Sequence, residues 1–160
     1  RFVTVGDDDA LPDGPAIVSL ERWQAERETL RARNSPIGGK LQSGQEPDAI
    51  AGDLDHIDVV ALDFPSYRNG RAYSYARLLR ERHGFKGEIR AVGNVLRDQF
   101  QYMIRCGFDA LEVADNITPE IFAENAGVFS LFYQPAADGK KTVLSLRQRL
   151  AARAQEKASA

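Results

Sequence analysis

The sequence predicts an α/β protein with a mainly parallel sheet of four to five strands, arranged as an open sheet or a partial barrel of βα units. Short apolar runs recur along the chain, the later ones about 20–30 residues apart, and each is followed by a stretch with helical periodicity. A helix between two strands returns the chain to the same end of the sheet, so this rhythm favours parallel pairing. The chain has 160 residues, whereas a closed eight-stranded barrel needs roughly 200. A closed barrel is therefore not expected. The length of 160 residues suits one compact domain, so we expect one domain over residues 1–160.

The strands are predicted where the apolar runs are rich in β-branched residues or end in an aromatic residue. These runs are residues 16–20, 58–64, 88–93 and 109–113, with 129–134 as a candidate fifth strand. Residues 35–47 contain Gly and Pro throughout, and this composition predicts a loop.

Helical patterns occupy most of the intervals between these runs. Residues 21–33 predict a charged surface helix, 47–54 a short helix, and 70–84 a helix that ends at Gly84. The next helix, up to Cys106, is expected to have Asn94 as its N-cap. Its buried stripe includes Cys106, which we expect to be a small core residue rather than a reactive thiol.

The C-terminal part of the chain contains two further helices. Thr118 has the character of an N-cap, Pro119 suits the first helical position, and Gly127 ends that helix. Residues 143–160 predict an amphipathic helix that frays into a tail. Its narrow apolar stripe could dock on the domain or pair with a second copy in a homo-oligomer.

The charge is distributed unevenly along the chain. The formal net charge is -2, yet residues 66–106 contain nine basic and three acidic side chains, and eight of the nine cations are arginine. The planar guanidinium fork suits phosphate, sulfate and carboxylate groups, so this bias indicates an anionic partner. The alternative is a solvated helix face that pairs with the acidic N-terminal third.

Ligands of parallel α/β sheets bind beyond the carboxyl ends of the strands. This rule selects Asp63, the loop 65–71 and Asn94. Binding roles are expected for Arg68, Arg71, Arg77, Arg90, Asn94, Gln99 and Arg105, and acid–base catalysis, if any, for Asp63 and Asp98.

Two of these side chains need partners of their own. Side chains alternate along a strand, so Glu88 and Arg90 share one face, and Arg90 requires a carboxylate from Glu88, Asp63 or Asp98. The resulting set is either a structural ion network or an arginine held for a ligand anion. Gln99 lies in the apolar half of its helix, so its amide should be bonded to the backbone or to a ligand.

Several kinds of chemistry find no support in the sequence. It has one cysteine, two histidines, and neither a GxGxxG, a phosphate loop, a GxSxG nor an HExxH motif. We therefore expect no metal and no cofactor. No apolar run approaches the ~18 residues of a membrane helix, and we expect a cytoplasmic protein without membrane or nucleic-acid partners.

Four blocks within residues 64–113 form a recognisable signature. They are FP (64–65), NGRAYSYARLLR (69–80), GEIRAVGNVLRDQ (87–99) and RCGFD (105–109). With them the chain resembles the bacterial family called domain of unknown function 934, in which aspartate is common at the position of Asn94.

The resemblance implies a role in assimilatory sulfite or sulfate reduction, because the family occurs beside sulfite reductase and its members are often labelled oxidoreductases of that process. One reading is an accessory protein that binds an anion such as sulfite, sulfate or a phosphate, or docks on sulfite reductase. The alternative is an oxidoreductase or transferase acting on a small sulfur-containing or phosphorylated anion. The residues show no flavin, nicotinamide, haem or iron–sulfur pattern, so the accessory role is favoured.

Overall fold

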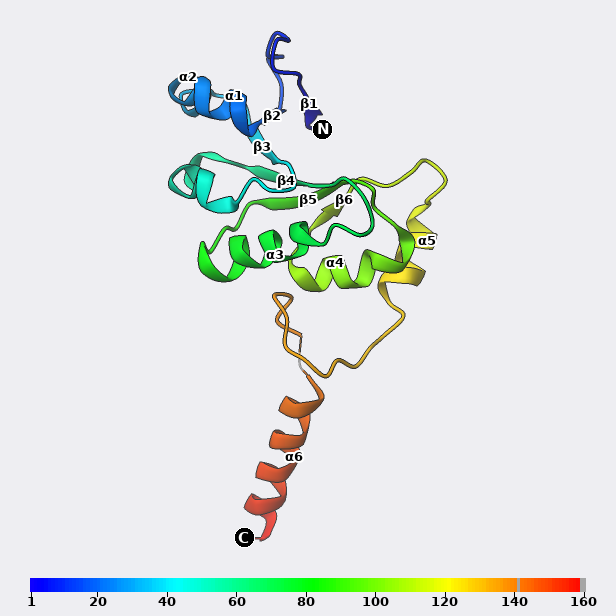
Figure 1. Ribbon diagram of the computed structural model, residues 1–160. Helices are drawn as coiled ribbons and strands as arrows, with labels where there is room; N and C mark the ends of the chain where they lie inside the picture. The colour runs from blue at the N-terminus through cyan, green and yellow to red at the C-terminus, as the bar shows by residue number, and fades with distance from the viewer. Residues whose placement is uncertain (141, 159–160) are drawn as a thin grey trace.

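The computed structural model describes residues 1–140 and 142–158 as a curled parallel sheet with helices along its outer side (Figure 1). The strands pair in sequence order, each parallel to the next. They are β1 (Val3–Thr4), β2 (Ala16–Ser19), β3 (Ile37–Leu41), β4 (Val59–Phe64), β5 (Glu88–Gly93) and β6 (Ala110–Leu111). The α/β class and the parallel sheet are confirmed, with six strands rather than four to five, and the architecture is a half-barrel.

The helices between strands lie on the outer side of this half-barrel, and the last two helices follow the final strand. They are α1 (Leu20–Ala25), α2 (Arg27–Arg31), the 3₁₀ helix η1 (Pro47–His56), α3 (Arg71–Arg77) with its π-helical continuation η2 (Leu78–Arg82), the 3₁₀ turn η3 (Arg97–Gln99) leading into α4 (Phe100–Cys106), α5 (Pro119–Ala126) and α6 (Val143–Ala158). Crossovers between parallel strands are right-handed, so a sheet in strict sequence order receives its crossover helices on one face. Within residues 1–140 and 142–158, the other, concave face carries no helix.

The two faces of the sheet have different cores. On the outer face, strand residues such as Leu62 and Ile89 pack with helix residues such as Trp23, Leu79 and Met103 in one large buried cluster. On the concave face, a small cluster contains only Ile17, Val59, Ala61 and Val92, with Phe2 against it. Alternation along each strand separates the two sets.

The predicted loop at residues 35–47 is wrong in its first half, because residues 37–41 form the central strand β3. A side chain at Gly38 would place its Cβ 2.8 Å from the Val59 carbonyl oxygen and 3.0 Å from Ile17 Cγ1. Only glycine permits this close approach of neighbouring strands. The composition that resembled a loop is therefore a packing requirement of the sheet.

The predicted helix boundaries need two corrections. The helix expected over residues 21–33 is divided at Glu26 into α1 and α2. Asn94 is not an N-cap, because the helix after β5 begins only at Arg97. Gly93 has φ +88°, and the Asn94 N–H donates to the Phe64 carbonyl oxygen at 2.7 Å. That contact continues the β4–β5 pairing and delays the helix.

Other predicted ends are confirmed. The Thr118 hydroxyl accepts from the Ile121 N–H at 3.4 Å and caps α5, which ends at Gly127. Gly84 has φ +65° directly after the helix that contains η2.

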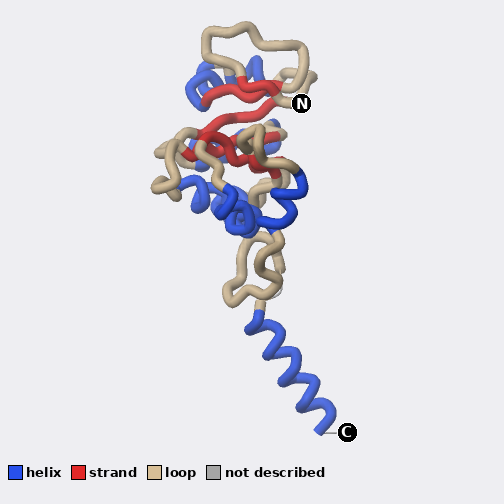
Figure 2. The backbone as a smooth tube through the Cα atoms, turned by 90° about the vertical axis from the view of Figure 1, so that its right-hand side faces the viewer, coloured by secondary structure: helices blue, strands red, loops and turns tan. Residues whose placement is uncertain are grey.

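The C-terminal part departs most from the predicted pattern. Residues 129–134 add no strand to the sheet, and only Phe132 forms an isolated bridge, with Thr142. Helix α6 projects away from the half-barrel (Figures 1 and 2). Across residues 1–140 and 142–158, none of the helices has the length and apolarity that a bilayer crossing requires.

Candidate functional site on the concave face

The concave face of the half-barrel carries charged side chains between its few apolar ones. Lys40 of β3, Asp63 of β4, and Glu88 and Arg90 of β5 lie on this face by strand alternation. Their side chains are 20–32 % exposed, because no helix covers them but the curl of the sheet does in part. The face is therefore polar, half-buried and open to a ligand.

Arg90 is the best-oriented cation on this face. Its Nε donates to Glu88 Oε1 at 2.7 Å, and its guanidinium carbon lies 5.6 Å from the centre of the Phe2 ring. Among the described residues, no acceptor forms a hydrogen bond with its two terminal nitrogens. The side chain is thus held at one edge while the donors at its end are free.

A cavity of about 620 Å³ lies beside Arg90, between the two edge strands of the half-barrel. Phe2 and Thr4 line it from the β1 side, and Leu111 and Glu112 line it from the β6 side. The volume is in the range of small-molecule sites. Its charged residues are Arg1, Arg90 and Glu112, so a bound anion would have to lie away from Glu112, toward the two arginines.

Lys40 and Asp63 form a second ion pair nearer the carboxyl ends of the strands. Their Nζ and Oδ1 atoms are 3.3 Å apart. In the sheet register Lys40 is opposite Ser19 and Ala61, and Ala61 is opposite Arg90. The two ion pairs therefore occupy adjacent positions on one face, and together they can offer a ligand both cations and carboxylates.

Ser19 of β2 is the neighbour of Lys40 on the side toward β1. Its hydroxyl donates to Asp7 Oδ1 at 2.5 Å and accepts from the Arg22 N–H at 3.0 Å, which caps α1. Both bonds are structural, so Ser19 is fixed in place rather than free to act as a nucleophile.

Five other predicted residues lie near the carboxyl edge of the sheet. Arg68, Arg71, Asn94 and Asp98 are exposed there, and Gln99 is half-buried. Arg68 donates to the Tyr67 hydroxyl at 2.8 Å. The Gln99 Oε1 is buried and accepts no hydrogen bond from the described residues. This oxygen therefore lacks the backbone hydrogen bond that the sequence led us to expect.

The structure places Arg77 and Arg105 away from this face, in the outer helix layer. Arg77 is half-exposed and pairs with Glu81 at 3.0 Å. Arg105 donates to the Gln134 carbonyl oxygen at 2.6 Å, pairs with Asp138 at 3.4 Å, and stacks on Phe132 with 3.7 Å between its guanidinium carbon and the ring centre. Arg105 fastens the C-terminal segment to α4 and does not share a recess with Arg90.

Cys106 lies next to these two arginines and is buried, as expected of a small core residue. Burial raises the pKa of its thiol, and the nearby Tyr102 hydroxyl and Arg77 offset this only in part. The thiol is therefore neutral at physiological pH, which is the unreactive form.

The sequence did not identify Lys40, Thr4 or Glu112 as site residues. Lys40 was hidden because its strand was predicted as a loop, and Thr4 because β1 has only two residues. The Glu88–Arg90 pair was found through strand alternation, and the structure confirms their contact. Within the described ranges, no group of three or more His, Cys, Asp or Glu side chains could hold a metal ion.

Comparison with known protein families identifies a match. The model of a bacterial protein family of unknown function (DUF934) matches residues 38–144, more than half of the chain. The matched region runs from the central strand β3 to the first turn of α6, and it includes Lys40, Asp63 and Arg90. A search of curated proteins found no match.

Proposed function

We propose that this chain, which belongs to the bacterial family of unknown function DUF934, is an accessory protein of assimilatory sulfite or sulfate reduction that binds a small oxyanion on its concave face. One observation carries the proposal: Arg90 is held by Glu88 with its terminal donors free beside a cavity of about 620 Å³. The link to sulfur metabolism comes from the family resemblance, and the geometry supports the choice of Arg90 as the anion-binding side chain.

The chemistry of Arg90 suits an oxyanion. Two parallel N–H donors of a guanidinium match two oxygens of a sulfate, sulfite, phosphate or carboxylate group, and such charge-assisted bonds are stronger than neutral ones. The Glu88 contact and the Phe2 ring limit the rotamers of Arg90, so less side-chain entropy is lost on binding. Partial burial also weakens competition from water and salt.

The test is calorimetric titration of the protein with sulfite, sulfate, adenylyl sulfate and inorganic phosphate at low ionic strength. We expect saturable binding of at least one of them. Arg90→Gln should weaken it by about 10- to 100-fold, the equivalent of one or two charge-assisted hydrogen bonds. Arg77→Gln is the matched control, because Arg77 is exposed in the outer layer.

Two results would contradict this proposal. Flat titrations with all four anions would show that the protein binds none of them. An equal loss of affinity in Arg77→Gln and Arg90→Gln would show that the anion does not bind at Arg90. Sulfite reductase itself is titrated in parallel, because the same guanidinium could donate hydrogen bonds to a carboxylate on the surface of a protein partner. Binding that appears only with the reductase would replace the small anion by a protein partner while keeping the accessory role.

An enzyme acting on a small sulfur-containing or phosphorylated anion is the second candidate, and the Lys40–Asp63 pair favours it. Catalytic groups of barrel enzymes lie at the carboxyl ends of strands, where Asp63 is the next-to-last residue of β4. In this candidate Arg90 positions the anion and Asp63 transfers a proton. Asp63→Asn would then abolish turnover without preventing anion binding, whereas Arg90→Gln would mainly raise KM.

A further inference from the structure

An apolar segment of six residues, 128–133, lies exposed between α5 and α6. Val128, Phe129, Leu131 and Tyr133 are 61–69 % exposed. These are among the most exposed large apolar side chains of the described residues, and the sequence between 128 and 133 contains no charge. Single exposed apolar residues are ordinary, but a contiguous group marks an interaction site.

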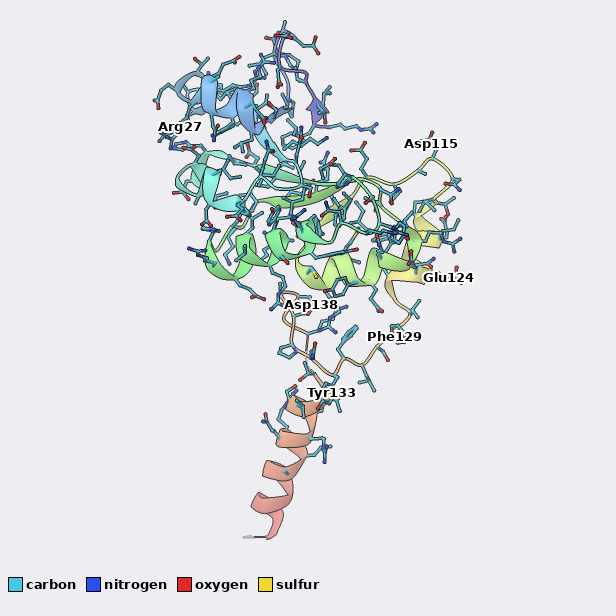
Figure 3. All side chains as sticks on the ribbon, in the orientation of Figure 1. Arg27, Asp115, Glu124, Phe129, Tyr133 and Asp138 are labelled. Carbon is cyan, nitrogen blue, oxygen red and sulfur yellow. The ribbon has the colours of Figure 1, made fainter. Side chains whose placement is uncertain are left out.

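The segment is fixed to the protein at both ends rather than hanging free. The Gln101 side chain donates to the carbonyl oxygens of Ala126 and Phe129 at 3.1 and 2.8 Å. At the other end Arg105 holds Gln134 and stacks on Phe132. Phe132 is consequently buried, and its neighbours Leu131 and Tyr133 point the other way, into solvent. Figure 3 shows Phe129 and Tyr133 on this segment below α4.

Helix α6 extends the same surface. The Val143 N–H donates to the Phe132 carbonyl oxygen at 2.8 Å, which joins the start of α6 to the segment. Leu144 and Leu150 of α6 are 43 % and 65 % exposed. The apolar segment and these two leucines form what we call the C-terminal surface.

We infer that the C-terminal surface is a self-association surface, through which two copies of this chain pair about a two-fold axis. The exposed apolar area of its six large side chains is roughly 600 Å² per copy, because an aromatic side chain can bury about 150–250 Å² and the six side chains are 43–69 % exposed. Two copies would bury about 1,200 Å², the lower limit of stable protein interfaces. This is an upper bound, because Leu144 and Leu150 lie about 120° apart around α6, so backbone pairing along residues 128–131 must add to the contact.

The chemistry of the segment selects a second copy as the occupant. Residues 128–133 are uncharged and contain no proline, and within the described residues no backbone–backbone hydrogen bond involves residues 128–131. The Phe129 carbonyl oxygen already accepts from Gln101. The other N–H and C=O groups of residues 128–131 can pair with the same groups of another copy, and a two-fold axis places identical patches opposite each other. No complementary charge is needed for this contact.

The ionic groups around the surface predict an unusual salt response. Lys140, Arg147 and Arg149 are exposed beside it, and the two-fold axis brings these cations of both copies toward each other. Salt screens like charges and leaves apolar contacts intact. The dimer should therefore become tighter as salt rises, whereas docking on an acidic partner through the same cations would become weaker.

This inference does not depend on the proposed function, because Arg90 lies on the concave face and the C-terminal surface lies outside the helix layer. A variant that is monomeric should still bind the oxyanion with unchanged affinity. Failure of one proposal therefore leaves the other standing.

The experiment is sedimentation equilibrium of the 160-residue chain up to about 200 µM, at about 50 mM and about 500 mM NaCl. We expect a monomer–dimer equilibrium whose dissociation constant is several-fold lower at the higher salt. The double variant Phe129→Ser/Leu131→Ser should weaken the dimer at least about tenfold, because it removes two central anchors. Tyr67→Ser, at 59 % exposure in another region, is the matched control and should dimerise normally.

Circular dichroism of each variant checks that the fold is retained, as expected for side chains this exposed. A protein that stays monomeric at both salt concentrations would overturn the inference. So would a dimer unaffected by the double variant, or one that weakens with salt. Binding of the monomer to anionic vesicles instead of to itself would assign the surface to a membrane and would also overturn it.

Discussion

The two faces of the sheet are made from the same strands, yet they have opposite character. On the outer face, Leu62, Ile89 and Ala91 are fully buried under helices. On the concave face, Asp63 and Arg90 alternate with these residues along β4 and β5, and Lys40 occupies the same face of β3. All three stay partly exposed. Parallel sheets are usually covered on both faces. Side chains on the uncovered face of this half-barrel therefore need not be apolar, and the face is available for binding.

Arg80 and Arg90 repeat this contrast in one residue type. Arg80 donates to the carbonyl oxygens of Gly107, Phe85 and Gly87 at 2.7–3.0 Å and pairs with Asp109. All of its donor nitrogens are used to join η2 to the starts of β5 and β6. Toward the residues that the structure describes, Arg90 uses only its Nε. The arginine-rich composition of residues 66–106 thus contains both structural and available guanidinium groups.

The largest expected effect is on the outer face. Phe64 is 1 % exposed and packs against Tyr73 and Phe108, with ring centres 5.0 and 5.8 Å apart. Phe64→Ala should lower the free energy of unfolding by about 3–5 kcal/mol in urea titrations. Val92→Ala on the concave face should cost no more than about 2 kcal/mol. Equal losses would remove the difference between the two cores.

Arg80→Met should destabilise the protein by about 2–4 kcal/mol, because several carbonyl oxygens and the Asp109 carboxylate lose their donors. Arg77→Met, on the exposed side of the same helical region, should change stability by no more than ~0.5 kcal/mol. The measurement is again urea unfolding. A small effect of Arg80→Met would mean that water replaces the guanidinium and that Arg80 is not structural.

Asp53 makes the stability of the outer helix layer depend on pH. It accepts from Trp23 Nε1 at 2.9 Å and from Arg27 Nη2 at 2.7 Å. Burial acts to raise the pKa of Asp53, but these bonds outweigh it and hold the pKa below its usual value. The carboxylate therefore stabilises the fold above about pH 4, and this contribution is lost as the pH falls through the lowered pKa.

Asp53→Asn tests that linkage. The variant should lose about 1–2 kcal/mol of stability at pH 7. It should also show a weaker decline in thermal stability between about pH 4 and pH 2 than the unmodified protein. Parallel pH profiles of the two proteins would contradict the assignment.

A small stability effect is also expected at Lys40. Its ion pair with Asp63 is partly solvated on the open face, so Lys40→Met should change the unfolding free energy by less than about 1 kcal/mol. Oxyanion affinity, measured by calorimetry, should fall only a few-fold, because Arg90 remains. A large loss of stability would show that the concave face is a core after all.

The sequence was sufficient for the parts of the fold that local patterns determine. The βα rhythm predicted β2, β4, β5 and β6, and Thr118 marked the start of α5. Strand β3 was missed because its glycines resemble the composition of a loop. Gly38 is needed there because the neighbouring strands leave no space for a side chain. Strand β1 was missed because two residues form no detectable period.

For the candidate site, alternation in β5 predicted the Glu88–Arg90 contact, and the carboxyl-end rule selected Asp63. Helix periodicity could not show that residues 132–138 fold back onto Arg105, since that contact joins segments 27 or more residues apart. It also could not supply Lys40, which depends on the missed strand. Long-range packing, rather than local pattern, decides which arginines are free.

The strict order β1 to β6 also bears on how this protein is made. Each strand needs only the one that precedes it, so the sheet can assemble progressively as the nascent chain leaves the ribosome. Such local pairing limits the loop-closure entropy of folding and favours rapid folding. Residues 128–133 emerge after β6, when every strand of the half-barrel already has its neighbour.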